Sequence, residues 1–367
     1  MAVLGATAAG YVSAITLAKK GRDVILLDGP TSAVESPLAD WIPFDTFGIC
    51  PALRAVRSAA TEAPFRRMQF HSPRLDRQAA YGSRSVAGFV LHSRKLRVAL
   101  DSAARRAGVG RLRLAEPPGI DLQEGGVVVT GKRQTRARLL LIAQDSPAEA
   151  MARLSLSDRS APAGGLSLCG LDVAITPAQR RKLGGDLHVV ARAAGRRLGV
   201  YFAAGGSLHV RIIFGARDVA PRAGGEALSL LVAGLQEAGL LTGKLNLARA
   251  AVAMWHPPGG VALDLETHLA KRTLLIGTAG GFASALTGQT LDPSVRSAMV
   301  AADVADRALK SQRPQELLAE YKSLWRDELA DRIRPPGTSV RMLLPMVLSN
   351  QAITDRFARA FLYGEDI

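Results

Sequence analysis

The chain has 367 residues, of which 48% are hydrophobic and 22% are charged, and its formal net charge is +15. This length permits a sizeable core and two subdomains, and the composition excludes long disordered segments. The arginines are scattered and no aromatic residues are interleaved with them, so the charge does not indicate a nucleic-acid surface; contact with an anionic membrane surface stays open.

The cysteines and the apolar runs further limit the class of protein to which the chain can belong. The two cysteines, Cys50 and Cys169, are far apart in the sequence, which excludes a disulfide framework and a C-x-x-C metal site. The N-terminal stretch is apolar, but its lysines follow the apolar part instead of preceding it, unlike those of a signal peptide. No uninterrupted apolar run is long enough to cross a bilayer. We therefore expect a cytoplasmic protein.

The opening stretch has the order of a nucleotide-binding unit. Residues 2–4 form a short apolar run, as in a buried parallel strand, and GATAAG follows as a tight turn. Residues 10–20 carry apolar side chains at helical spacing, Gly21 suits the end of that helix, and the next strand closes at Asp28. Such a unit presents the N-terminus of a helix to a pyrophosphate and a carboxylate to a ribose.

The turn departs from the pattern G-x-G-x-x-G at its middle position. Gly5 and Gly10 are present, but Thr7 replaces the glycine that normally allows the closest approach to phosphate. A threonine adds a Cβ and a methyl group, although its hydroxyl could donate to phosphate. The candidate cofactor-binding residues of this unit are Gly5, Ala6, Thr7, Ala8, Ala9, Gly10 and Asp28.

Two later stretches each carry a charged residue where a strand meets a helix. In FVLHSRKLRVALD, Arg94 begins a helix with Leu96 and Leu100 at helical spacing. In TRARLLLIAQDSPAEAM, an apolar strand ends at Asp145, and Ser146 follows. Simpler interpretations stay open: Arg94 as an incidental basic residue at an exposed helix end, and Asp145 as the N-cap of the next helix.

A third stretch, RTLLIGTAGGFASALTGQTLDPSVRSAM, has the pattern of a strand, a loop of small residues and a long helix. Small residues allow a backbone to approach a flat ligand closely, whereas the simpler alternative is a purely structural glycine-rich loop. The candidate cofactor-binding residues here are Gly277, Thr278, Gly288, Gln289 and Thr290.

In this order, the motifs resemble those of the FAD-dependent superfamily of para-hydroxybenzoate hydroxylase and geranylgeranyl reductase. The resemblance covers the chain from end to end. It implies an α/β fold with a Rossmann-like FAD-binding domain of the glutathione-reductase type, a second domain with an antiparallel sheet, and C-terminal helices. It also implies that Arg94 contacts FAD and that Asp145 belongs to an Asp-Gly motif. Thr278 stands where a ribityl-binding aspartate is usual, and Thr290 replaces a glycine.

The family's fold is discontinuous along the chain. It implies an FAD-binding domain of residues 1–62, 88–160 and 270–312, a substrate domain of residues 63–87 and 161–269, and C-terminal helices in residues 313–367. The strand-like segments RRMQFHSP, DLHVVARA, LGVYFAAGG and LHVRIIFGA fit the second domain, as does the amphipathic segment GGEALSLLVAGLQEAG. The last region has helical patterns interrupted at RPPGTS.

Substrate contacts are expected from the second domain. Tyr201 and Phe202 are the aromatic residues of one of its strands, and His209 on the next could face the substrate; strand packing is an equal alternative for the two aromatics. The six histidines are scattered and none pairs with another at ligand spacing, so the sequence predicts no metal site.

The resemblance implies FAD as the cofactor, NAD(P)H or another reductant as the electron donor, and a small, apolar substrate. We expect reduction of carbon–carbon double bonds, as in geranylgeranyl reductases. A flavin-dependent monooxygenase is one alternative. The other is a non-catalytic protein that keeps the fold and binds FAD weakly or not at all, which the threonines at 7, 278 and 290 favour.

The C-terminal segment SVRMLLPMVLSNQAITDRFARAFLYG mixes Met, Leu and Phe with Arg341, Arg356 and Arg359. Basic residues beside apolar ones suit an anionic lipid surface, so this region could contact a membrane or a lipid substrate. The alternative is a set of helices that pack on the domain, with their arginines in solvent.

Overall fold

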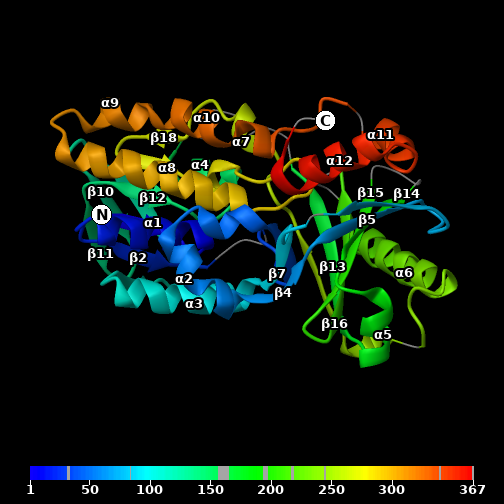
Figure 1. Cartoon of the computed structure of the whole chain (residues 1–367). Coiled ribbons are helices and arrows are strands. Elements are labelled where there is room, and N and C mark those ends of the chain that lie inside the picture. Colours follow the sequence, from blue (N-terminus) through cyan, green and yellow to red (C-terminus); the bar gives the residue numbers. More distant parts are fainter. Residues whose placement is uncertain are drawn as a thin grey trace.

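The computed structural model contains a mostly parallel sheet flanked by helices, and beside it a larger, mostly antiparallel sheet (Figure 1). The predicted fold class, an α/β domain with a second antiparallel sheet and C-terminal helices, is confirmed. The structure describes residues 1–30, 34–82, 84–155, 165–192, 197–215, 219–243, 245–338 and 340–365.

The first sheet has six strands in the order β18-β19-β12-β1-β2-β8. Its members are β1 (Ala2–Leu4), β2 (Ile25–Asp28), β8 (Gly110–Arg113), β12 (Leu140–Ile142), β18 (Leu269–Ala270) and β19 (Thr273–Leu275). The neighbours pair in parallel except β18 and β19. The predicted strands at 2–4 and before Asp28 are therefore confirmed.

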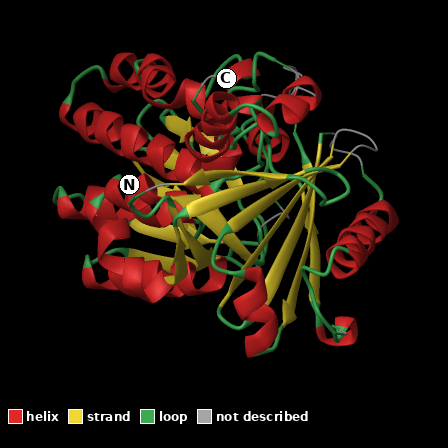
Figure 2. Ribbon diagram, turned by 45° about the vertical axis from the view of Figure 1, so that its right-hand side comes forward, coloured by secondary structure: helices red, strands yellow, loops and turns green. Residues whose placement is uncertain are grey.

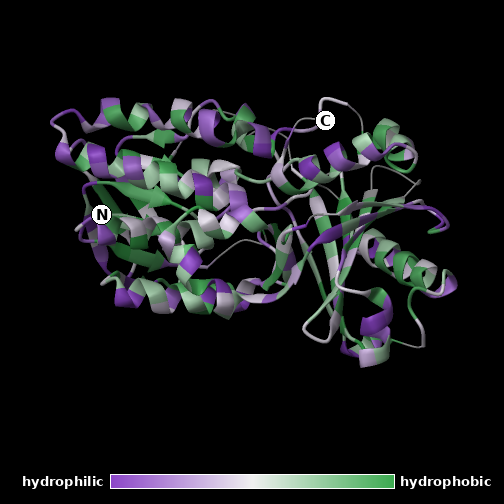
Figure 3. Cartoon of the chain, viewed as in Figure 1, coloured by the Kyte–Doolittle hydropathy of each residue, from purple (hydrophilic) through white to green (hydrophobic). Residues whose placement is uncertain are grey.

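Helices and a small sheet cover the two faces of the parallel sheet. The helical side contains α1 (Ala8–Lys19), α2 (Pro51–Ala60), α3 (Ser93–Arg106), α8 (Leu291–Lys310), α9 (Pro314–Ala319) and α10 (Tyr321–Ile333). The other side contains β9 (Gly119–Leu122), β10 (Val127–Thr130), β11 (Gln134–Ala137), α4 (Pro147–Arg153) and α7 (Val261–Asp264). Successive strand residues alternate between these two cores: Val3 packs with the helices, and Leu4 packs with the small sheet. The strands are correspondingly hydrophobic in Figure 3.

The second large sheet has seven strands in the order β17-β13-β16-β15-β14-β5-β6. Its members are β5 (Arg67–His71), β6 (Gln78–Gly82), β13 (Ser167–Ala174), β14 (Leu187–Arg192), β15 (Arg197–Ala204), β16 (Ser207–Phe214) and β17 (Ala251–Trp255). The pairs are antiparallel except β14 and β5. In Figure 2 the long strands form a fan, with α6 (Pro221–Glu237) on its outer side. Helix α5 (Pro177–Leu183) lies beside the same sheet.

A small sheet and the last helices complete the molecule. The small sheet has the order β3-β7-β4, from β3 (Ala39–Pro43), β4 (Thr61–Phe65) and β7 (Gly88–His92). Helices α11 (Val340–Val347) and α12 (Gln351–Tyr363) pack on the face of the large sheet opposite α6. Among the described residues, no helix has the length and apolar character needed to span a membrane.

The predicted domain bounds stay a prediction, and the boundary at residues 160 and 161 lies outside the described part of the chain. The interruption predicted at RPPGTS lies between α10 and α11.

Candidate functional site

A cavity of about 470 Å³ lies at the carboxyl ends of β1, β12 and β19. The loops after these strands contribute Thr7, Asp145 and Thr278 to its wall. Open α/β sheets bind ligands at this edge, and the cavity has the volume of a small-molecule site. We call it the central cavity.

Part of the predicted cofactor set lies in the wall of the central cavity. The predicted residues that line it are Ala6, Thr7, Ala8, Arg94, Asp145, Thr278, Gln289 and Thr290. The predicted residues outside its lining are Gly5, Ala9, Gly10, Asp28, Gly277 and Gly288. Four segments far apart in the sequence thus meet at one cavity.

Two of the retained glycines are required by the packing of the chain itself. A Cβ on Gly10 would collide with the carbonyl oxygen of Gly5. Gly277 has a φ of +57°, and a Cβ there would lie 2.8 Å from the Cβ of Ala9. These contacts hold α1 against the sheet, so the two glycines indicate the fold and not, by themselves, a bound cofactor.

Thr7 uses its side chain within the fold. It is the N-cap of α1: its Oγ1 accepts from the Gly10 N–H at 3.2 Å and donates to the Ala143 carbonyl at 2.9 Å. The single hydroxyl hydrogen is therefore engaged, and the side chain covers part of the helix N-terminus that would otherwise face a pyrophosphate.

The N-terminus of α8 offers a contrasting arrangement. Its N-cap is Thr290, whose side chain makes no capping hydrogen bond, and both Thr290 and Leu291 line the central cavity. Thr278, 1% exposed, also lines it, and its Oγ1 has no hydrogen-bond partner. A buried hydroxyl without a partner costs free energy, so this wall is prepared for a polar ligand atom.

Asp145 lies on a strained turn between β12 and α4. Its φ is +75°, it is buried, and Arg153 Nε donates to its Oδ2 at 2.9 Å. Burial raises the pKa of Asp145, although Arg153 opposes this effect. The alternative that Asp145 caps α4 is wrong, because Ser146 is the N-cap and forms a capping box with Glu149.

Asp28 lies at the end of β2, outside the central cavity, and two arginines contact it. Arg111 Nη2 donates to its Oδ2 at 2.5 Å, and Arg97 Nη2 lies 3.4 Å from both carboxylate oxygens. The expected ribose acceptor is therefore paired within the chain.

Two further carboxyl groups line the central cavity and were missed by sequence reasoning. Burial raises the pKa of Glu35 to about 7 and that of Asp40 to about 6. Asp40 Oδ1 accepts from Gln289 Nε2 at 2.8 Å and from the Trp41 N–H at 2.9 Å. No local motif marks these acids, because their burial comes from segments distant in the sequence.

Gln144 is a third residue that the sequence did not single out. It is fully buried and lines the central cavity, and its Oε1 has no hydrogen-bond partner. Its side chain packs over Gly5 and lies near Gly29. It supplies a second polar atom that a ligand in the central cavity could satisfy.

The three predicted substrate residues lie outside the lining of the central cavity. Tyr201 packs in the core beneath α6, whereas Phe202 faces the core beneath α12 and stacks on His209 with ring centroids 4.8 Å apart. His209 Nδ1 lies 2.9 Å from Asp172 Oδ1, which Arg211 also contacts at 2.8 Å. The three stay predictions as substrate contacts.

The fold also joins two histidines that are far apart in the sequence. His71 Nε2 lies 3.0 Å from His188 Nδ1, and the ring of His188 stacks on Tyr201. Burial lowers the pKa of each histidine to about 4. Within the described ranges, no group of three or more His, Cys, Asp or Glu residues is placed to hold a metal ion.

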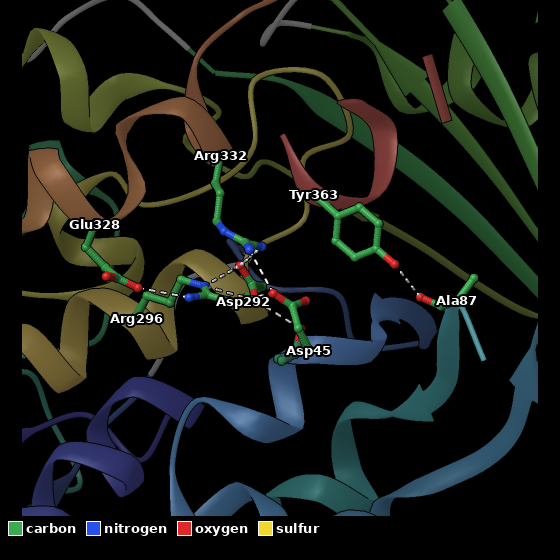
Figure 4. Close-up of polar contacts among 8 residues, drawn as sticks. Asp45, Ala87, Asp292, Arg296, Glu328, Arg332 and Tyr363 are labelled. Carbon is green, nitrogen blue, oxygen red and sulfur yellow. Dashed lines mark hydrogen bonds and ion pairs between the residues drawn. The ribbon is translucent and has the colours of Figure 1, made fainter. Parts of the chain in front are cut away.

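An ion-pair network fixes the N-terminal turn of α8 (Figure 4). Arg296 and Arg332 both contact Asp45, at 2.8 and 2.7 Å, and both contact Asp292, at 3.1 and 3.3 Å. Glu328 lies 2.9 Å from Arg296. The network joins α8, α10 and the short 3₁₀ turn Phe44–Gly48, and it therefore positions the α8 end that borders the cavity.

Solved structures share this fold over nearly the whole chain. A geranylgeranyl bacteriochlorophyll reductase-like protein from Thermoplasma acidophilum is 16% identical with a TM-score of 0.74, and the match covers 99% of this chain and 96% of that one. PqsL from Pseudomonas aeruginosa, a probable FAD-dependent monooxygenase, is 16% identical with a TM-score of 0.65 and 98% coverage of both chains. CmlS, a flavin-dependent halogenase, is 17% identical with a TM-score of 0.68, over 90% of this chain and 62% of that one.

The chain has the fold of FAD-dependent oxidoreductases. No protein-family model and no curated protein matches its sequence. The described residues at the central cavity fit a cofactor with polar atoms, because Thr278 and Gln144 present unpartnered polar atoms there and the α8 N-terminus lacks a side-chain cap. At the predicted pyrophosphate and ribose positions, Thr7 and Asp28 are engaged within the chain.

Proposed function

We propose that this protein is an FAD-dependent oxidoreductase that reduces carbon–carbon double bonds of an apolar substrate. The observation that carries the proposal is the central cavity itself. It lies where the carboxyl ends of three parallel strands meet the N-terminus of α8, and its wall has two buried polar atoms without partners, Thr278 Oγ1 and Gln144 Oε1. The flavin supplies hydride-transfer chemistry when bound.

The chain's own residues supply binding and protons. Thr278 and the α8 N-terminus would hold polar atoms of the cofactor, and Arg94 lies in the same wall. Reduction of a double bond needs a proton as well as a hydride. Glu35 and Asp40 face the cavity with pKa values raised by burial to about 7 and about 6, so each is partly protonated near neutral pH and could donate a proton.

The cavity wall favours an apolar substrate. Much of it is hydrophobic, from side chains of α3, β3, β7 and β17; these residues are Ile42, Leu91, Leu96, Leu100, Met254 and Trp255. The reductase-like neighbour also has a higher TM-score than PqsL, 0.74 against 0.65. Both points support the reductase proposal, and a flavin-dependent monooxygenase remains the alternative reaction on the same site.

A second candidate function is a non-catalytic protein that keeps the fold. Two of the predicted cofactor-binding positions favour it. Arg97 and Arg111 contact the carboxylate oxygens of Asp28, and the Thr7 side chain caps α1. In this alternative the motif positions serve only packing and capping.

Titration of the protein with FAD, followed by flavin fluorescence, tests the proposal. We expect saturable binding to the wild type. Thr278→Val keeps the shape and removes the unpartnered hydroxyl, so it should weaken binding about three- to tenfold, the contribution of one neutral hydrogen bond.

The matched control is Thr273→Val. Thr273 is also buried, but it lies on β19 outside the cavity and donates its hydroxyl to the Lys271 carbonyl at 3.1 Å. This variant should bind FAD like the wild type. The absence of saturable binding to any of the three proteins would instead support the non-catalytic alternative.

A further inference from the structure

A second, larger cavity lies beside the central cavity. Its volume is about 1020 Å³. Its wall includes two acidic residues, Asp28 and Glu116, and four cationic ones, Arg97, Arg113, Lys132 and Arg133. Arg97 belongs to the walls of both cavities. A ligand that occupied both cavities would therefore pass Arg97 and Asp28.

The two arginines that contact Asp28 are held very differently. Arg111 is two-thirds buried and bridges two carboxylates, with 2.5 Å to Asp28 and 2.6 Å to Asp101. The Arg97 side chain is 54% exposed and reaches Asp28 only at 3.4 Å. Arg111 is thus a fixed part of the structure, whereas Arg97 makes a long and weak contact that solvent can replace.

We propose that Arg97 gates the passage between the two cavities and competes with the adenylate part of a dinucleotide for Asp28. This inference rests on the proposed function, because FAD is the ligand that would span both cavities. When Arg97 moves away, Asp28 Oδ1 becomes free to accept a hydrogen bond, while Arg111 keeps Oδ2 and holds the carboxylate in place.

Arg97 has a second acidic neighbour on the side of the central cavity. Glu35 lies in that wall, and the positive charge of Arg97 lowers its pKa against the larger effect of burial. A displaced Arg97 side chain can therefore remain near a carboxylate, which reduces the cost of breaking its contact with Asp28. The chain carries, at the junction of the cavities, a cation with an acid on either side.

The test compares Arg97→Gln with Arg105→Gln and the wild type. Both variants remove one cation from α3, so they change the general attraction for anions equally. Arg105 is 70% exposed, pairs with Asp101 and lies in neither cavity wall. The probes are FAD, ADP as the adenylate half and FMN as the flavin half, each titrated by calorimetry or fluorescence.

We expect Arg97→Gln to bind FAD and ADP about two- to fivefold more tightly than Arg105→Gln, the range set by loss of a half-exposed ion pair. FMN should bind the two variants equally. If Arg97→Gln and Arg105→Gln bind FAD with the same affinity, and likewise ADP, the gating role is overturned while the proposed function stays in place. Weaker FAD binding by Arg97→Gln would also overturn it, because Arg97 would then be a direct cofactor contact. No binding of any probe by any form would remove both proposals.

Discussion

Asp40 is a residue whose surroundings oppose its charge. It lines the central cavity, and burial raises its pKa to about 6, although Gln289 and the Trp41 N–H donate to it. For a carboxyl group whose pKa is higher in the folded state than in the unfolded state, the contribution to stability is complete at pH values below the unfolded pKa, near 3.8. That contribution is lost as the pH rises through the folded pKa, about 6.

Asp40→Asn keeps the shape and removes the titration. The variant should therefore gain stability relative to the wild type as the pH rises from about 4 to about 6, by on the order of 2 kcal/mol, and the difference should be constant above that range. Urea unfolding at several pH values measures it. Asp121→Asn, on the exposed part of β9, should show no such gain. If the difference in free energy of unfolding between Asp40→Asn and the wild type does not change with pH, Asp40 does not have a raised pKa.

Elements, and not single motifs, set the geometry of the cavity. The N-terminal turn of α8 is held by Arg296, whose side chain is 12% exposed and contacts Asp45, Asp292 and Glu328. Removing it leaves these partly buried carboxylates with fewer cations, and breaking such pairs is costly.

We expect Arg296→Ala to lower the free energy of unfolding by about 3 kcal/mol. The matched variant is Arg307→Ala on the same helix, whose pair with Glu320 is exposed at both ends, 46% and 44%, and which should lose less than about 1 kcal/mol. Urea denaturation measures both. Equal losses would mean that the network in Figure 4 contributes no more than a surface pair.

The last two helices differ in how they pack. Helix α12 is part of the core, because Phe361 stacks on Trp41 and Phe357 meets Phe70 edge-on. Helix α11 exposes Met342 and Met346, at 68% and 40%. Helix α12 therefore fits the alternative that the C-terminal helices pack on the rest of the protein. Contact with lipid remains a proposal for α11. The side chain of Arg341 lies outside the described residues.

If α11 contacts an anionic membrane, replacing Met342 and Met346 together by Ser should lower the partition coefficient for vesicles containing anionic lipid by about a hundredfold or more, since each buried apolar side chain contributes about 1.5–3 kcal/mol. Leu324→Ser, at a 38% exposed position of α10, is the control. Equal sedimentation of all three proteins, or none, would remove α11 as a lipid-binding surface.

On the scale of the whole molecule, the sequence predicted the order of elements and part of the cavity wall. The strand–turn–helix units at Thr7, Asp145 and Thr278 could be recognised because each is local and its spacing repeats a known pattern. The sequence could not show whether a threonine hydroxyl has a hydrogen-bond partner, because Thr7 donates to the carbonyl of Ala143, a residue distant in sequence. The raised pKa values of Glu35 and Asp40 arise from burial by several segments, so no local signal reveals them.

The two candidate reactions differ in their use of dioxygen. A monooxygenase consumes dioxygen as a substrate, whereas a double-bond reductase does not. We therefore expect the flavin-loaded, reduced protein to be reoxidised slowly when mixed with aerated buffer without substrate, with little hydrogen peroxide formed. Stopped-flow absorbance and a peroxide assay measure this. Fast reoxidation, or oxygen transfer to a product, would favour the monooxygenase over the reductase.

We propose that this chain still holds a flavin at the central cavity. The most direct test is the visible absorption spectrum of the protein after incubation with excess FAD and gel filtration to remove the unbound cofactor. We expect flavin bands that elute with the protein and weaken in Thr278→Val. A folded protein that elutes without flavin absorbance would contradict it.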